Sequence, residues 1–200
     1  LSLRGNFTTG GTKVSPEASW YLPLWPTYLG QVKYTAPLTN RLLIEAGVSY
    51  ERGDFVVDFQ PANPKTNIAK WDRGTSWVYE NQYLSYTYEQ RLLSTKASVS
   101  YVTGSHSVKA GYENRIGNAI QTNPFHGDMS IRYVINNVPS SVVVVNGEAK
   151  NKQEIRFDGG AYLQDQWKLR RVTINAGGRW DHFNAGIPAN DLPDVRGHAL

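Results

Sequence analysis

The chain has 200 residues, of which 40% are hydrophobic and 12% are aromatic, and its mean hydropathy is −0.47. Its formal charge of +4 comes from scattered Lys and Arg residues without a concentrated basic run, which argues against nucleic-acid binding. The absence of cysteine excludes disulfides and thiolate chemistry, and no apolar run reaches the roughly 18–20 residues of a membrane-spanning helix.

The first predicted element is a β-hairpin near residues 28–50. On its first arm Val32 and Tyr34 alternate with polar residues, and on its second arm Ile44 and Val48 do the same. A short polar turn connects the arms. Because successive side chains of a strand point to opposite sides, this period of two predicts strands with one apolar and one polar face.

A second hairpin with the same plan is predicted near residues 94–115. Val99 alternates with polar residues before a short turn, and Val108 alternates with them after it. Tyr86 and Tyr88 are predicted to extend the first arm. Their parity differs from that of Val99, so we expect a β-bulge between them.

A third hairpin is predicted near residues 153–184, around a short basic turn. Its apolar faces end in Trp167 or Trp180. The first arm places Ile155, Phe157, Gly159, Ala161 and Leu163 on one face, and Glu154, Arg156, Asp158, Gly160, Tyr162 and Gln164 on the other. The second arm places Val172, Ile174, Ala176, Gly178 and Trp180 opposite Thr173, Asn175, Gly177, Arg179 and Asp181.

The connections near 51–82 and 116–152 are rich in Pro, Asn, Asp and Gly, and we expect them to be long loops. Within the second one, residues 130–145 are predicted to form strand again, with an interruption at Pro139. Short turns at one end and long loops at the other are typical of outer-membrane barrels and unusual in soluble domains.

These patterns predict an all-β fold that forms part of a large antiparallel transmembrane β-barrel, with hydrocarbon outside and water inside. The polar face carries charges that a dry core seldom accepts, and we expect a cross-strand charge ladder there that could also guide an ion. The charged residues of this parity are Lys33, Glu45, Lys96, Lys109, Glu113, Glu154, Arg156, Asp158, Arg179 and Asp181.

Several segments resemble TonB-dependent outer-membrane receptors. Residues 162–181 carry Asp165 and Trp167 and then Gly178, Arg179 and Asp181, which resemble a motif of that barrel. More narrowly, the segments TAPLTNRLLIEAGVSY, YVTGSHSVKAGY and RYVINNVP resemble the Oar-like receptors, which carry an N-terminal carboxypeptidase-regulatory-like domain.

The resemblance implies a barrel of about 22 strands in a Gram-negative outer membrane, with short turns in the periplasm and long loops outside. It also implies a plug domain, a TonB complex that supplies energy through an N-terminal segment, and a ligand such as a siderophore, cobalamin, glycan or peptide. The chain begins at Leu1 without a secretory signal. We expect residues 1–200 to be an internal piece of one receptor barrel, without the plug domain.

Loop aromatics are the candidate ligand contacts, because rings stack on sugars and flat chelates. They are Trp20, Trp25, Trp71, Trp77 and Tyr79. The four histidines, His106, His126, His182 and His198, do not show metal-ligand spacing, so we expect no metal, no cofactor and no catalytic group. We expect Asp165 to lie at the membrane edge, near water or Lys168, where a carboxylate is tolerable.

The predicted function is energised ligand uptake across the outer membrane by a TonB-dependent receptor, without bond chemistry. Three alternatives stay open. One is a soluble, aromatic-rich β-sandwich that binds carbohydrate, in which Val172, Ile174 and Ala176 would pack against a second sheet. The others are an outer-membrane surface or adhesion protein without transport, and an enzyme built into an outer-membrane barrel.

Overall fold

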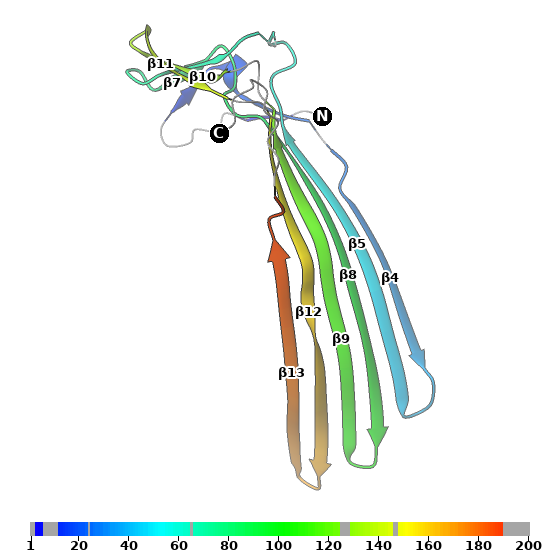
Figure 1. Cartoon of the computed structure of the whole chain (residues 1–200). Coiled ribbons are helices and arrows are strands. Elements are labelled where there is room, and N and C mark those ends of the chain that lie inside the picture. The colour runs from blue at the N-terminus through cyan, green and yellow to red at the C-terminus, as the bar shows by residue number, and fades with distance from the viewer. Residues whose placement is uncertain are drawn as a thin grey trace.

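The computed structural model describes residues 3–5, 12–23, 25–64, 66–124, 129–145 and 148–189. A six-stranded antiparallel sheet dominates it, in the order β13-β12-β9-β8-β5-β4, so that each long strand pairs with the long strand before it (Figure 1). The strands are β4 (Tyr28–Pro37), β5 (Leu42–Val57), β8 (Tyr86–Thr103), β9 (His106–Asn123), β12 (Ala149–Leu169) and β13 (Val172–Gly186). This meander confirms the predicted all-β architecture.

A small five-stranded sheet lies at one end of the long sheet, away from the short turns that join β4 to β5, β8 to β9 and β12 to β13 (Figure 1). Its order is β11-β10-β6-β7-β2. The strands are β2 (Lys13–Val14), β6 (Ala69–Asp72), β7 (Trp77–Tyr79), β10 (Met129–Ile135) and β11 (Val138–Val144). The 3₁₀ helix η1 (Pro16–Ala18) and a pair of strands, β1 (Leu3–Gly5) and β3 (Trp20–Leu22), complete this region.

Buried apolar residues gather near the small sheet. Val57, Val78 and Ile131 are among those with less than a tenth of their surface exposed. Away from the small sheet, apolar side chains of the long sheet stay partly exposed, because no second layer among the described residues packs on them. Val99 is 43% exposed and Ile174 is 44% exposed. The described residues therefore contradict a sandwich in which Ile174 packs against a second sheet.

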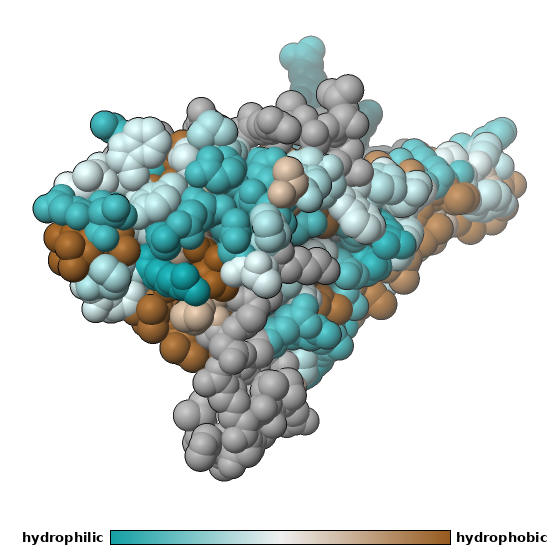
Figure 2. All heavy atoms as spheres, turned by 90° about the horizontal axis from the view of Figure 1, so that it is seen from above, coloured by the Kyte–Doolittle hydropathy of each residue, from teal (hydrophilic) through white to brown (hydrophobic). Residues whose placement is uncertain are grey.

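Alternation and register divide the long sheet into two faces. The apolar face includes Val32, Tyr34, Ile44, Val48, Tyr50, Val99, Tyr112, Leu163, Ile174 and Trp180, and the polar face includes Lys33, Glu45, Lys96, Ser98, Lys109, Glu113, Arg115, Asp158, Arg179 and Asp181. From above, hydrophobic residues follow one side of the receding sheet and hydrophilic residues follow the other (Figure 2).

The apolar face has the height of a membrane. On β12 it runs from Trp167 to Phe157, which is roughly 33 Å of strand. Strands of outer-membrane barrels tilt by about 35–45°, so this length gives a height of about 25 Å, as in their apolar bands. Among the described residues, no helix is long and apolar enough to cross a bilayer.

The strands are longer than predicted, and the connections near 51–82 and 116–152 are correspondingly shorter. β5 continues to Val57, β9 continues to Asn123, and β12 already begins at Ala149. The sequence pattern underestimates the strand lengths because, toward the small sheet, the apolar residues no longer stay on one face. The hydrogen-bonded backbone ladder nevertheless continues. The predicted return to strand in residues 130–145 is confirmed by β10 and β11, but the interruption lies at Asn136 and Asn137 and not at Pro139, which pairs with Val134 inside β11.

The predicted bulge between Tyr88 and Val99 is wrong, because β8 keeps an unbroken register with both neighbours. The bulge lies in β12 instead, between Ile155 and Asp158. It moves Ile155 to the parity of the polar face and places Arg156 on the other side. The predicted faces of the third hairpin are therefore correct from Phe157 onward and wrong before it.

Candidate functional site

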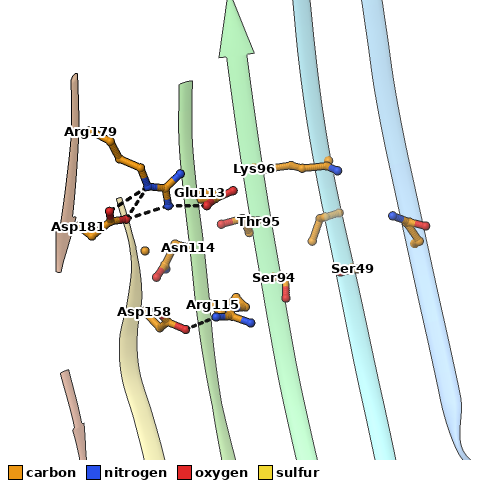
Figure 3. A pocket seen from close by; sticks show the side chains of 14 residues that line it. Ser49, Ser94, Thr95, Lys96, Glu113, Asn114, Arg115, Asp158, Arg179 and Asp181 are labelled. Carbon is orange, nitrogen blue, oxygen red and sulfur yellow. Dashed lines mark hydrogen bonds and ion pairs between the residues drawn. The ribbon is translucent and has the colours of Figure 1, made fainter. Parts of the chain in front are cut away.

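A hollow of about 420 Å³ lies on the polar face, and residues of all six long strands, from β4 to β13, line it (Figure 3). It is the candidate site because charged side chains of both signs converge there. Its charged lining consists of Lys96, Glu113, Arg115, Asp158, Arg179 and Asp181. Hollows on this face are expected if the sheet curls toward it, as the wall of a barrel does.

Arg179 binds two carboxylates in the hollow. Its Nη2 donates to Oε1 of Glu113 at 2.6 Å, and its Nε donates to the two carboxylate oxygens of Asp181 at 2.8 and 2.9 Å (Figure 3). Arg179 and Asp181, singled out in the sequence, thus share one network with Glu113. All three side chains are about half exposed, so the network fixes their positions more than it stabilises the fold.

The charge ladder continues along the same face. Arg115 pairs with Asp158 at 2.5 Å, and Glu45 lies 3.4 Å from Lys33 and 3.5 Å from Lys109. These contacts confirm the predicted cross-strand charge ladder for the residues that form it. Opposite charges spread over five strands neutralise one another along the wall.

The model of the outer membrane beta barrel domain family matches residues 28–192, which include the whole long sheet. The chain belongs to this family. No curated protein and no solved structure matches the chain. Membership assigns the two faces of the barrel domain: the apolar face contacts lipid of the bacterial outer membrane, and the polar face lines the inside.

The short-turn end of the barrel domain holds two of the family-like residues. Asp165 Oδ2 lies 2.6 Å from Nδ1 of His106, and the Trp167 indole donates to Ser105 Oγ at 3.1 Å. The rings of His106 and Trp167 stack at 5.3 Å. Asp165 lies near the short turns, and its partner there is His106 and not Lys168, while its place at the membrane edge stays a prediction. Gly178 faces the lipid side, with no atom near the position of an added Cβ.

The small sheet gathers three of the predicted ligand-contact aromatics. Trp71 lies 5.9 Å from the rings of both Tyr83 and Tyr133, so it packs within the sheet. Tyr79 donates to Asn137 Oδ1 at 3.1 Å, and Trp77 is 41% exposed beside Lys13.

The other two aromatics belong to different segments of the chain. Trp20 lies on β3, and Trp25 is 52% exposed in the stretch before β4. Exposure makes Trp25 and Trp77 the members of the predicted set best placed for stacking on a ligand. Among the described residues, no group of three or more His, Asp or Glu side chains is arranged to hold a metal ion.

Sequence reasoning missed a second hollow, of about 510 Å³, on the inner side of the barrel domain toward the small sheet. Leu92, Ile155 and Phe183 belong to its lining. Two signals could have revealed it. The apolar residues of β8 change parity between Leu92 and Val99, and β12 carries the bulge that turns Ile155 inward.

Proposed function

We propose that this barrel domain belongs to a TonB-dependent receptor of the Oar-like type, which takes up a ligand across the outer membrane of a Gram-negative bacterium with energy from TonB. The supporting observation is the charged inner wall. A wall with ion pairs from Lys33 to Arg179 suits a wide, hydrated passage better than a small packed barrel.

The proposal places the two ends of the long sheet on opposite sides of the membrane. The short turns face the periplasm, and the connections that carry the small sheet face the medium. The partners are membrane lipid, a plug domain, the TonB complex and a ligand that is a siderophore, cobalamin, glycan or peptide. The protein moves its ligand and performs no bond chemistry, so the proposal assigns no catalytic residue.

The test is uptake in cells that express the complete protein, with and without TonB. Radiolabelled ferric siderophore, cobalamin, oligosaccharide and peptide are supplied in turn. At least one of them is expected to accumulate in TonB-containing cells and to fall at least tenfold without TonB, whereas a small porin substrate enters both equally. Equal accumulation of every probe in both strains contradicts the proposal.

A surface or adhesion role without transport is the second candidate, and the edge of the small sheet favours it. All residues of β11 are exposed, and Val138 is 64% exposed. Unpaired edges of this kind add strands from other chains. Loss of cell attachment on deletion of 138–144, with no TonB-dependent uptake of any probe, identifies this role.

A further inference from the structure

The apolar side chains of the long sheet change face toward the small sheet. Tyr88 and Leu92 share the parity of Lys96, and the bulge of β12 gives Ile155 the same parity. Near the small sheet, the inner side of β8, β9, β12 and β13 therefore carries a cluster of apolar residues, and Glu51 on β5 lies beside Leu92 at the border of this cluster. Along the rest of the sheet the same side is charged.

The outer side of the sheet changes from apolar to charged toward the small sheet. On the parity of the lipid-facing residues, Arg52 pairs with Asp54 at 2.8 Å, and Arg91 pairs with Asp54 at 3.1 Å and with Glu89 at 2.9 Å. A Lys or Arg on the lipid face costs about 2–4 kcal/mol at the bilayer centre and little near the interfaces. These rows therefore lie beyond the hydrocarbon, and the apolar surface behind them faces the inside of the barrel.

That apolar surface forms the hollow of about 510 Å³. The volume lies in the range of small-molecule sites, which combine apolar walls with a few polar groups. Its side chains on the inner parity are Tyr88, Gln90, Leu92, Ala119, Gln153, Ile155, Phe183 and Ala185. Phe183 is 65% exposed, so a large apolar group is available to a ligand.

The absence of a side chain at Gly117 deepens this hollow. A Cβ at Gly117 would collide with the backbone oxygen of Arg91 and lie 3.1 Å from Cδ1 of Leu92. The row of Leu92, Gly117 and Ile155 therefore alternates large and absent side chains across three neighbouring strands. The result is a depression between two apolar ridges.

A free cation lies on the same strand below the depression. Lys96 follows Leu92 by four positions on β8, which separates their Cα atoms by roughly 13 Å. In the part of the chain that the structure describes, the Lys96 ammonium has no ion pair. Glu113 is its cross-strand neighbour, but Arg179 holds that carboxylate at 2.6 Å. Figure 3 shows Lys96 directed away from Glu113, toward β5.

We propose that the depression receives the apolar part of an amphipathic ligand whose carboxylate reaches Lys96. The inference rests on the proposed function, since it names the class of ligand that would be taken up. A body of aromatic or alkyl character fills the space among Leu92, Ile155 and Phe183. A chain of about six bonded carbons spans the remaining distance to the ammonium.

The test is equilibrium binding of dansyl-aminohexanoate, an aromatic group joined by a six-carbon chain to a carboxylate. The complete protein is held in lipid nanodiscs, and dansyl fluorescence reports entry into an apolar site. Saturable binding is expected, weakened at least tenfold by Leu92→Gln and Ile155→Gln. Val102→Gln is the matched control, because Val102 shares the inner parity at the far end of β8 and is 47% exposed. This variant is expected to bind the probe normally.

Lys96→Gln keeps the proposal testable independently of any folding defect, because Lys96 is exposed and without an ion pair in the described residues. It is expected to weaken the carboxylate probe severalfold and to leave binding of the corresponding carboxamide unchanged. Two results overturn the proposal. One is that the wild type shows no saturable binding, and the other is that wild type, L92Q and K96Q bind the probe equally.

Binding needs neither TonB nor energy, so the two proposals fail separately. Intact binding with energy-independent uptake contradicts the transport proposal alone. TonB-dependent uptake with a binding site insensitive to L92Q and K96Q contradicts the amphipathic-ligand site alone.

Discussion

Arg179 on β13 reaches over β12 and donates a hydrogen bond to Glu113 on β9 at 2.6 Å. Gly160 of β12 lies in register with both Glu113 and Asp181. An added Cβ at Gly160 would collide with the Asp181 carboxylate and the Trp180 backbone. Glycine at this position therefore leaves the path over β12 open and lets charges on three strands join one network.

Gly160→Val is expected to reduce folding of the barrel, because the new side chain forces β12 and β13 apart. We predict a severalfold lower folded fraction after refolding into liposomes, measured by the heat-dependent band shift in gel electrophoresis. Gly178→Val is the matched control, since nothing lies within 4 Å of a Cβ at Gly178. Equal folded fractions for the two variants contradict this account.

A second prediction concerns Asp72, which is 5% exposed and joins two turns of the small sheet. Its carboxylate accepts backbone N–H groups of Gly74 at 2.8 Å, Thr75 at 3.3 Å, and Asn136 and Asn137 at 3.0 Å. Burial alone raises the pKa of Asp72, but these four donors outweigh burial and lower the pKa below its ordinary value.

Because the folded pKa is lowered, the ionised carboxylate stabilises the small sheet above the ordinary Asp pKa of about 4. That stabilisation is lost as the pH falls from there through the lowered pKa. Hydrogen exchange at the amides of Asn136 and Asn137, corrected for intrinsic rates, is expected to lose protection over this range.

Asp72→Asn is expected to lower this amide protection at neutral pH and to remove its acid dependence. Asp58→Asn serves as the control, since Asp58 Oδ1 accepts the N–H of the adjacent Phe59. Acid-dependent protection that persists unchanged in D72N rules out this role for Asp72.

A third prediction separates packing from ligand contact among the aromatics. Trp71→Ala removes two ring contacts of about 0.5–1.5 kcal/mol each, so the small sheet is expected to lose about 1–3 kcal/mol of stability. Trp77→Ala and Trp25→Ala are expected to leave denaturant unfolding nearly unchanged and to weaken binding of the ligand that the proposed receptor would take up. The reverse pattern, with Trp71 dispensable for stability, contradicts the assignment.

The sequence alone predicts the lipid-spanning part of the fold, whereas beyond it the sequence predicts strand in residues 130–145 and misses the continuation of β5, β9 and β12. Between Trp167 and Phe157 one face meets hydrocarbon, so the solvent imposes an alternation that is legible in the residues, with Asp165 as an exception near the turn. Toward the small sheet we infer water on the outer side, where Arg91 lies, and the apolar Leu92 lies on the inner side. The backbone ladder of β8 continues unbroken through this change.

The sequence also predicts only part of the candidate site. The parity of Arg179 and Asp181 predicts their place on the polar wall, because strand alternation fixes it. Their link to Glu113 depends on the absence of a side chain at Gly160, which alternation does not encode. The partners of Trp71 come from distant segments that only tertiary packing brings together.

The central claim is that hydrocarbon covers one face of the long sheet and water the other. Val99 and Ser98 are adjacent on β8 and lie on opposite faces, and Ser98 lies next to Glu45. The decisive measurement is folding stability in phospholipid vesicles for Val99→Lys and Ser98→Lys. The account predicts a loss of about 2–4 kcal/mol for V99K and almost none for S98K. Equal losses, or a larger loss for S98K, would contradict it.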